Sequence, residues 1–281
     1  MAAQRERSVR RAALSWRWWS PGAGRLGRAL LRRVEYLLIP VALLVVVQLW
    51  KLVAYLGQYP EFILPQPESV ARRFVLLASD GLLWKHTSLT VLESLLGFLV
   101  GLVFATAVGY LLAKSPLLEK LLSPYLVASQ SIPIVAVAPL LVLWFGFGLT
   151  SKVVAAFIIC FFPILINTIV GVRTIDPESR ELMHTLSASP WQVFWKLEVP
   201  AALPVYLGGV RVGITLSVIG AVVGEFVGAD QGLGYLISQS RGFFDTATMF
   251  VALLTLVAMA LTLYLSVVGL ERILLRSRRR G

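Results

Sequence analysis

The apolar residues of this chain are gathered into long stretches that short charged segments separate. A helix needs about 20 apolar residues to cross the hydrocarbon core of a membrane. Four stretches of that length are uncharged, and two more contain only one or two charged residues. The pattern therefore predicts an all-α integral membrane protein with six transmembrane helices. They cover residues 36–56, 94–113, 121–151, 153–172, 201–227 and 246–270.

The composition supports this prediction and excludes other classes of protein. Of the 281 residues, 57% are hydrophobic and 15% are charged, whereas about 25% are charged in soluble domains. A disordered chain is excluded and a soluble globule is disfavoured. A single cysteine excludes an internal disulfide framework, and with only two histidines it cannot form a zinc cluster.

The basic residues predict the orientation of the helices. Residues 1–35, 113–122, 173–200 and 272–281 contain 19 of the 26 Lys and Arg residues, and six spans place these segments on one side. Because cytoplasmic segments carry an excess of Lys and Arg, we expect a multi-pass protein of the cell (cytoplasmic or inner) membrane with both termini in the cytoplasm. This topology accounts for the net charge of +11, so we expect membrane lipid and no nucleic acid as a partner.

The same pattern divides the chain into four regions. Residues 1–34 form a basic cytosolic segment, whose Arg and Trp residues either lie on the lipid headgroups or belong to a cytosolic tail. Residues 35–85 contain the first transmembrane helix and an extracytoplasmic loop. Residues 86–272 form the membrane core, and residues 273–281 form a basic cytosolic tail.

The cytoplasmic loop at 173–200 contains the signals of two short helices. Asp176 and Pro177 predict the start of the first helix, which continues to about Leu186. Ser189 and Pro190 predict the start of a second helix with a capping box, and Pro200 is expected to end it. The sequence thus predicts a helix-turn-helix at the membrane surface, either a docking element or a structural connector. Its apolar face consists of Leu182, Met183 and Leu186.

The loop reads Glu181-Leu182-Met183, three residues, Ser187, nine residues, and Leu197-Glu198-Val199-Pro200. It resembles the EAA loop of the membrane subunits of ATP-binding-cassette (ABC) importers. That motif reads Glu-Ala-Ala, three residues, Gly, nine residues, and Ile-x-Leu-Pro. The chain therefore keeps the Glu, the spacing and the Pro, but it has Ser187 where the motif has Gly. Serine adopts a turn with positive φ only at a cost in free energy.

Three further blocks extend the resemblance over about residues 60–272. Residues 129–148 look like the third span of nitrate/sulfonate/taurine-type permeases. Residues 209–226 and the Gly-Leu-Gly-Tyr-Leu-Ile sequence at 232–237 look like the fifth span and its outer loop. These last blocks are most similar to the branch that imports thiamine-precursor pyrimidines and riboflavin. Residues 86–272 would then be the permease core domain, with 173–200 as its coupling loop.

The resemblance implies a type I ABC importer permease that moves a small solute delivered by a binding protein. The expected partners are two ABC ATPase subunits, a second copy of this chain, and a soluble or lipid-anchored substrate-binding protein. The chain has no GxxxxGK[ST] phosphate-binding loop. We therefore expect no bound cofactor and no enzymatic activity of its own, with ATP hydrolysis on the separate subunit. The residues that would couple to that subunit are Glu181, Leu182, Met183, Leu186, Ser187 and Pro200.

Four polar residues inside the predicted spans are candidates for the translocation path. Arg211 and Glu225 share one helix face, and charges in a membrane usually face a bundle interior or a water path. Alternatively, Arg211 reaches the inner interface and Glu225 lies at the outer one. Gln130 and Ser131 lie beside Pro133, so they either line the path or repair the hydrogen bonding of the interrupted helix.

Two other classes of protein compete with the importer. A gradient-driven secondary transporter would show inverted internal repeats with paired broken helices, and no such self-similarity is visible. A membrane-embedded enzyme would need paired carboxylates or a metal cluster at membrane depth. For the importer, the substrate expected first is riboflavin or a thiamine-precursor pyrimidine, and next a sulfonate, taurine or nitrate.

Overall fold

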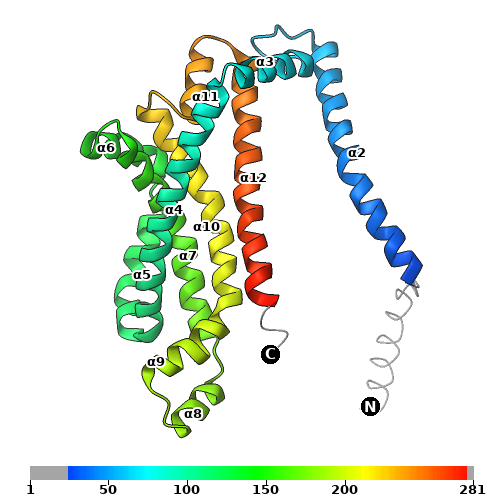
Figure 1. Cartoon of the computed structure of the whole chain (residues 1–281). Coiled ribbons are helices and arrows are strands. Elements are labelled where there is room, and N and C mark those ends of the chain that lie inside the picture. The colour runs from blue at the N-terminus through cyan, green and yellow to red at the C-terminus, as the bar shows by residue number, and fades with distance from the viewer. Residues whose placement is uncertain (1–24, 277–281) are drawn as a thin grey trace, which may run out of the picture. The chain divides into compact units, whose positions relative to one another are not determined.

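The computed structural model describes residues 25–276, and all regular elements in this range are helices (Figure 1). Contacts between residues divide the chain into two units, one ending at Gln58 and one beginning at Tyr59. The first unit contributes α2 (Arg25–Gly57). The second contains α3 (Pro67–Ser79), α4 (Leu82–Lys114), α5 (Pro116–Gln130), α6 (Ile134–Phe145), α7 (Leu149–Arg173), α8 (Pro177–Thr185), α9 (Pro190–Val193), the π-helical segment η2 (Phe194–Glu198), α10 (Val199–Gly228), α11 (Leu233–Gly242) and α12 (Thr246–Arg276).

The predicted multi-span helical architecture is confirmed. The helices α2, α4, α7, α10 and α12 are each long and apolar enough to cross a membrane. The predicted span at 121–151 is not one straight helix, because α5 and α6 meet at an angle of 95°. Ser131 and Pro133 lie between the two helices, where the proline has no amide hydrogen to continue the helix. Residues 1–24 of the predicted basic segment and 277–281 of the predicted tail lie outside the described range.

Helix α7 lies between α4 and α10 and forms the core of the second unit. Glycines on α4 permit one of these close contacts, because a Cβ on Gly97 would overlap Ala156 and one on Gly101 would overlap the Cys160 sulfur. Gly97 and Gly101 form a GxxxG pair, which is a pattern that lets two membrane helices approach closely. Buried side chains of the three helices then fill the centre of the unit: Phe98, Ala105, Ile164, Leu165, Val210 and Ile214.

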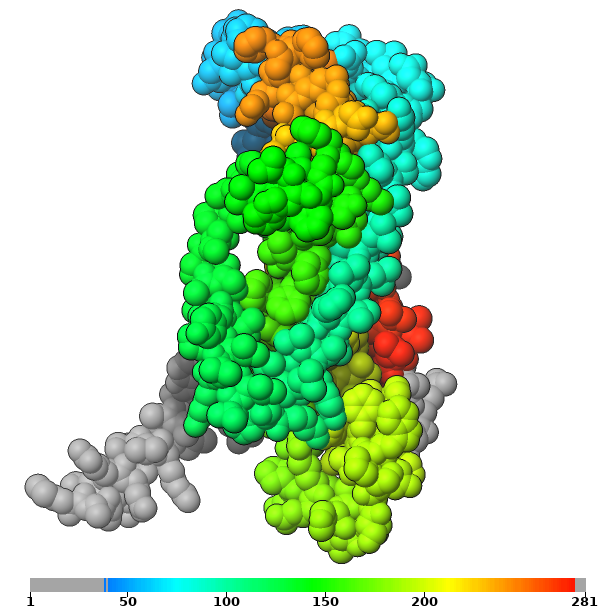
Figure 2. Space-filling view, turned by 90° about the vertical axis from the view of Figure 1, so that its left-hand side faces the viewer, coloured from blue at the N-terminus to red at the C-terminus, as the bar shows by residue number. Residues whose placement is uncertain are grey.

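The bent α5–α6 pair stands away from this core. No residue of α5 is buried, and Figure 2 shows an opening between the green α5–α6 arm and the helices behind it. Arg173 at the end of α7 pairs with Glu119 of α5 at 2.5 Å. This ion pair therefore holds one end of the arm against the core.

The second unit has two ends (Figure 1). We call the end with α8 and α9 the inner end, and the end covered by α3 and α11 the outer end. The outer helix α3 is attached to α12 because Arg73 donates hydrogen bonds to Asp245 and Thr248. Burial alone would raise the pKa of Asp245, but hydrogen bonds from Thr248 and Arg73 hold that pKa below its ordinary value.

The predicted orientation can be tested with cysteines placed at the two ends. Asp230 is exposed at the outer end, Ser179 is half-buried on α8 at the inner end, and the native Cys160 is fully buried. We expect a membrane-impermeant maleimide to label Asp230→Cys in intact cells and Ser179→Cys only after permeabilisation. The unaltered chain, with its buried thiol, is the control. Labelling of both variants from the same side would contradict the six-span topology.

Candidate functional site

The coupling loop folds as the two capped helices that the sequence predicts. The Asp176 side chain accepts a hydrogen bond from the Glu178 amide at the start of α8. Ser189 and Gln192 form a capping box at the start of α9. Figure 2 shows this loop in yellow-green, projecting from the inner end of the unit. Side-chain caps satisfy amides that a helix start leaves without partners, so the loop is a defined surface feature.

Ser187 ends α8 in a left-handed conformation, with a φ of 52°. Its amide donates to the His184 carbonyl at 2.9 Å, and the Ala188 amide donates to the Met183 carbonyl at 3.0 Å. This pair of bonds is a Schellman motif, which normally has glycine at its left-handed position. The structure thus explains why the EAA motif has Gly at this position, and it shows that serine occupies the same turn here.

The predicted apolar face of α8 is largely open to its surroundings. Leu182 is 60% exposed and Leu186 is 66% exposed, while Glu181 is exposed and Met183 is half-buried. Apolar side chains at helical spacing beside a carboxylate are typical of a helix that binds in a groove of a partner. The arrangement at α8 therefore offers a contact surface and no catalytic constellation.

The expected helix end at Pro200 is wrong. The chain continues from α9 through η2 into α10, and Pro200 lies in the first turn of α10. In η2 the Val199 amide donates to the Phe194 carbonyl, five residues earlier. Proline has no amide hydrogen, so position 200 donates no helical hydrogen bond, but the helix continues through it directly after the π-helical segment. The loop is thus continuous with a transmembrane helix.

A buried carboxylate joins the loop to the membrane helices. Glu198 is 1% exposed, and it accepts hydrogen bonds from the Tyr110 hydroxyl at 2.8 Å and from the Lys114 ammonium. Arg180 of α8 approaches the same carboxylate at 3.5 Å, and it donates to the Val172 carbonyl of α7 at 2.9 Å. We call these four groups the Glu198 junction: Glu198, Tyr110, Lys114 and Arg180.

The junction connects α8 with α4, α7 and α10 at one point. The sequence does not reveal it, because Glu198 lies 84 residues after Lys114 and 88 residues after Tyr110. The available signal was a single acidic residue among aromatic and aliphatic ones at 191–203. Its geometry joins α8 to the membrane helices by hydrogen bonds and ion pairs.

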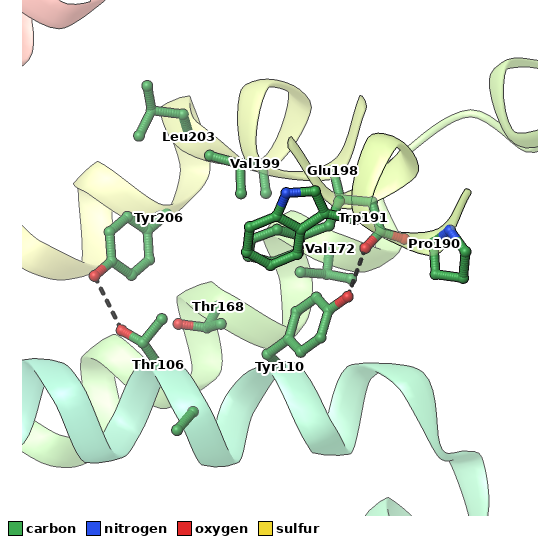
Figure 3. A pocket seen from close by; sticks show the side chains of 13 residues that line it. Thr106, Tyr110, Thr168, Val172, Pro190, Trp191, Glu198, Val199, Leu203 and Tyr206 are labelled. Carbon is green, nitrogen blue, oxygen red and sulfur yellow. Dashed lines mark hydrogen bonds between the residues drawn. The ribbon is translucent and has the colours of Figure 1, made fainter. Parts of the chain in front are cut away.

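A cavity of about 610 Å³ lies directly behind the junction (Figure 3). The figure shows Tyr110 and Glu198 on one side and the Thr106–Tyr206 pair, 2.9 Å apart, on the other. The remaining wall is mostly apolar and comes from α7, α9, η2 and α10. It includes Thr168, Val172, Pro190, Trp191, Val199 and Leu203.

At the outer end, three side chains hold the first turn of α11. The Gly232 amide donates to His86 Nδ1 at 2.9 Å, and the Leu233 amide donates to Thr90 Oγ1 at 2.8 Å. The Gly234 amide donates to Glu225 Oε2 at 2.5 Å. A carboxylate at a helix N-terminus satisfies free amides and the helix dipole together. Gly232 has a φ of 111°, and a Cβ there would overlap the Glu225 carboxylate.

The four candidate path residues lie at different places. Glu225 is 1% exposed and anchors α11, whereas Arg211 pairs with Glu271 of α12 at 3.3 Å. Gln130 and Ser131 are exposed at the bend between α5 and α6. The structure therefore does not bring the four into one cluster, and their role in translocation stays a prediction.

The described residues form a bundle of apolar helices with a continuous two-helix loop at one end. Its fold is that of a subunit in the MetNI methionine ABC transporter, with a TM-score of 0.62 and 20% identity over 70% of this chain and 97% of that one. Residues 97–280 match the family model "Binding-protein-dependent transport system inner membrane component", and the chain belongs to this family.

Two curated relatives show which kinds of permease this chain is similar to. The chain is 50% identical to the riboflavin transport system permease protein RibX of Chloroflexus aurantiacus, over 88% of this chain and 92% of that protein. It is 34% identical to the formylaminopyrimidine transport permease protein ThiX of Halalkalibacterium halodurans, over 84% and 94%. The chain is therefore the permease subunit of an ABC importer in the inner membrane, and it is a transport protein rather than an enzyme.

Replacing Ser187 with glycine should stabilise the coupling loop. The left-handed conformation costs a non-glycine residue about 1–2 kcal/mol, and glycine's greater freedom in the unfolded chain offsets about 0.5–1 kcal/mol of the gain. We expect Ser187→Gly to slow hydrogen exchange of the Ala188 amide, which bonds to Met183. Ser187→Ala keeps the Cβ and should show no slowing. Equal exchange in the glycine and alanine variants would contradict a strained turn.

Proposed function

We propose that this permease imports a vitamin-like heterocycle, with riboflavin first and a thiamine-precursor pyrimidine second. The observation that carries the proposal is the 50% identity to a riboflavin permease over 88% of the chain. The likeness to a formylaminopyrimidine permease supports the same class of substrate. Relatives named for transport of taurine or aliphatic sulfonates are less similar than the riboflavin permease, at 28–34% identity, and the highest of these values equals that of the formylaminopyrimidine permease.

The energy for transport comes, in this proposal, from two ATPase subunits that bind the coupling loops of a permease dimer. The exposed face of α8 supports this role, since Leu182 and Leu186 need an apolar partner and Glu181 lies beside them. A groove in the ATPase that accepts the leucines and pairs with the carboxylate fits this face. The substrate arrives at the outer end on a separate binding protein.

The Glu198 junction gives the proposed coupling a route into the membrane. A displacement of α8 acts on Arg180, whose partners are the Glu198 carboxylate and the Val172 carbonyl. Glu198 also holds Tyr110 and Lys114 of α4. Movement of the loop is therefore passed to α4, α7 and α10 together, as expected of a rigid-body transition between two orientations of the pore.

The second permease copy is expected against the α5–α6 arm. No residue of α5 is buried within the unit, and the arm is open on the side that Figure 2 displays. Large apolar side chains such as Leu117 and Tyr125 are exposed there. A second arm would cover them by a self-complementary contact, which is the commonest form of homodimer.

Reconstituted uptake tests this function. Proteoliposomes containing the permease and its co-purified ATPase, with binding protein and radiolabelled riboflavin, should accumulate riboflavin only with ATP. We expect Glu181→Lys to abolish uptake, because a positive charge replaces the carboxylate at the docking face. Asp80→Lys makes the same charge reversal at an exposed outer residue and should transport normally. Uptake by the permease alone on an ion gradient would instead establish a secondary transporter.

A further inference from the structure

A second cavity, of about 450 Å³, lies at the outer end between the end of α10, α11 and the α6–α7 connection. Aromatic rings line much of its wall, together with two polar side chains of α11 and the carboxyl group of Glu225. We call it the outer cavity, and its larger side chains are Phe147, Glu225, Phe226, Tyr235, Ser238, Gln239 and Phe243. The function described so far does not use this cavity.

Two walls of the outer cavity are fixed to each other by a buried ammonium group. Lys152 is 1% exposed, and it donates hydrogen bonds to the carbonyl oxygens of Phe147 and Gly228. Phe147 lies in the α6–α7 connection, and Gly228 ends α10. A Cβ on Gly228 would come within 3.0 Å of the Phe147 ring. The Phe147 ring is therefore held close to the end of α10.

The third wall is fixed by the contacts that anchor α11. Glu225 binds the Gly234 amide, and the adjacent Tyr235 ring stacks on His86 with centroids 6.0 Å apart. The Tyr235 hydroxyl accepts a hydrogen bond from the Gln239 amide at 2.8 Å. Burying polar and charged groups such as Lys152 and Glu225 costs free energy. Here Lys152 bonds to backbone carbonyls of two cavity walls, and Glu225 accepts hydrogen bonds from the Thr90 hydroxyl and the Gly234 amide. The outer cavity is thus preorganised by the fold.

The end of α11 contains a strained residue beside the cavity. Phe244 has a φ of 57°, which is rare for a bulky side chain, and such strain persists mainly where surrounding structure enforces it. Its ring packs against Phe62 with centroids 6.3 Å apart. This conformation sets the direction of the chain immediately after Phe243, which lines the cavity and is 77% exposed.

We propose that the outer cavity receives the planar ring system of the substrate when it leaves the binding protein. This inference rests on the proposed import of a heterocycle. Aromatic faces bind flat heterocycles by stacking, and the Gln239 amide and Ser238 hydroxyl offer hydrogen bonds to ring carbonyls and nitrogens. The wall contains the Glu225 carboxyl group and no basic side chain, so the cavity suits an uncharged ring that can hydrogen-bond and offers no ion pair to a sulfonate or a nitrate.

Riboflavin itself is the probe, because its fluorescence is sensitive to stacking. The unaltered permease in lipid nanodiscs, without binding protein, should quench riboflavin fluorescence in a saturable manner. Loss of one stacking ring in Phe243→Ala should weaken this binding about tenfold and lower the rate of ATP-driven uptake. Phe243→Tyr keeps a ring and should behave like the unaltered chain. Trp84→Ala is the matched control, because Trp84 is as exposed as Phe243, at 76%, and lies outside the cavity.

The outcomes separate the cavity from the proposed function. Suppose that the unaltered complex takes up riboflavin and that Phe243→Ala and Trp84→Ala behave alike. This result would contradict the role of the outer cavity but not the proposed substrate. An unaltered complex that takes up no riboflavin would overturn riboflavin as the substrate and the outer cavity as its binding site. Since Phe243 is exposed, none of its variants should alter the melting temperature, which checks that each protein is folded.

Discussion

Burial of the Glu198 carboxylate is the constraint on which the inner end of this permease depends. A charge taken out of water is tolerated only when other charges and hydrogen-bond donors surround it. Here the compensating groups come from different parts of the chain: Tyr110 and Lys114 from α4, and Arg180 from α8. Removing any one of these partners would leave the buried charge without full compensation. The coupling loop and the membrane helices are therefore held together.

Helix α10 carries such an anchor at both ends. Glu198 directly precedes it, and Glu225 lies in its last turns, about 40 Å away at 1.5 Å per residue. Glu198 binds Arg180 of the cytoplasmic loop, and Glu225 accepts a hydrogen bond from the Gly234 amide in the first turn of α11. Between them, α7 packs against both α4 and α10. Packed helices therefore connect the inner end of the unit with its outer end.

Local patterns explain which features were predictable. The apolar stretches predicted the membrane helices because length and hydropathy are properties of contiguous residues. The caps at Asp176 and Ser189 were predictable for the same reason. The bend between α5 and α6 was not, although Pro133 indicated an interruption, because its angle depends on what surrounds the helices. The helix end predicted at Pro200 was wrong, because a proline alone does not distinguish the end of one helix from the first turn of the next.

The Glu198 junction and the outer cavity depend on contacts between distant segments, which a single sequence does not reveal. Hydrogen exchange of α8 measures the central claim most directly, since that helix meets the junction through Arg180. In lipid nanodiscs, Glu198→Gln should speed exchange of the amides at 177–185 while those at 233–242, at the outer end, remain unchanged. Unchanged exchange in α8 would show that the junction does not hold the coupling loop to the membrane helices.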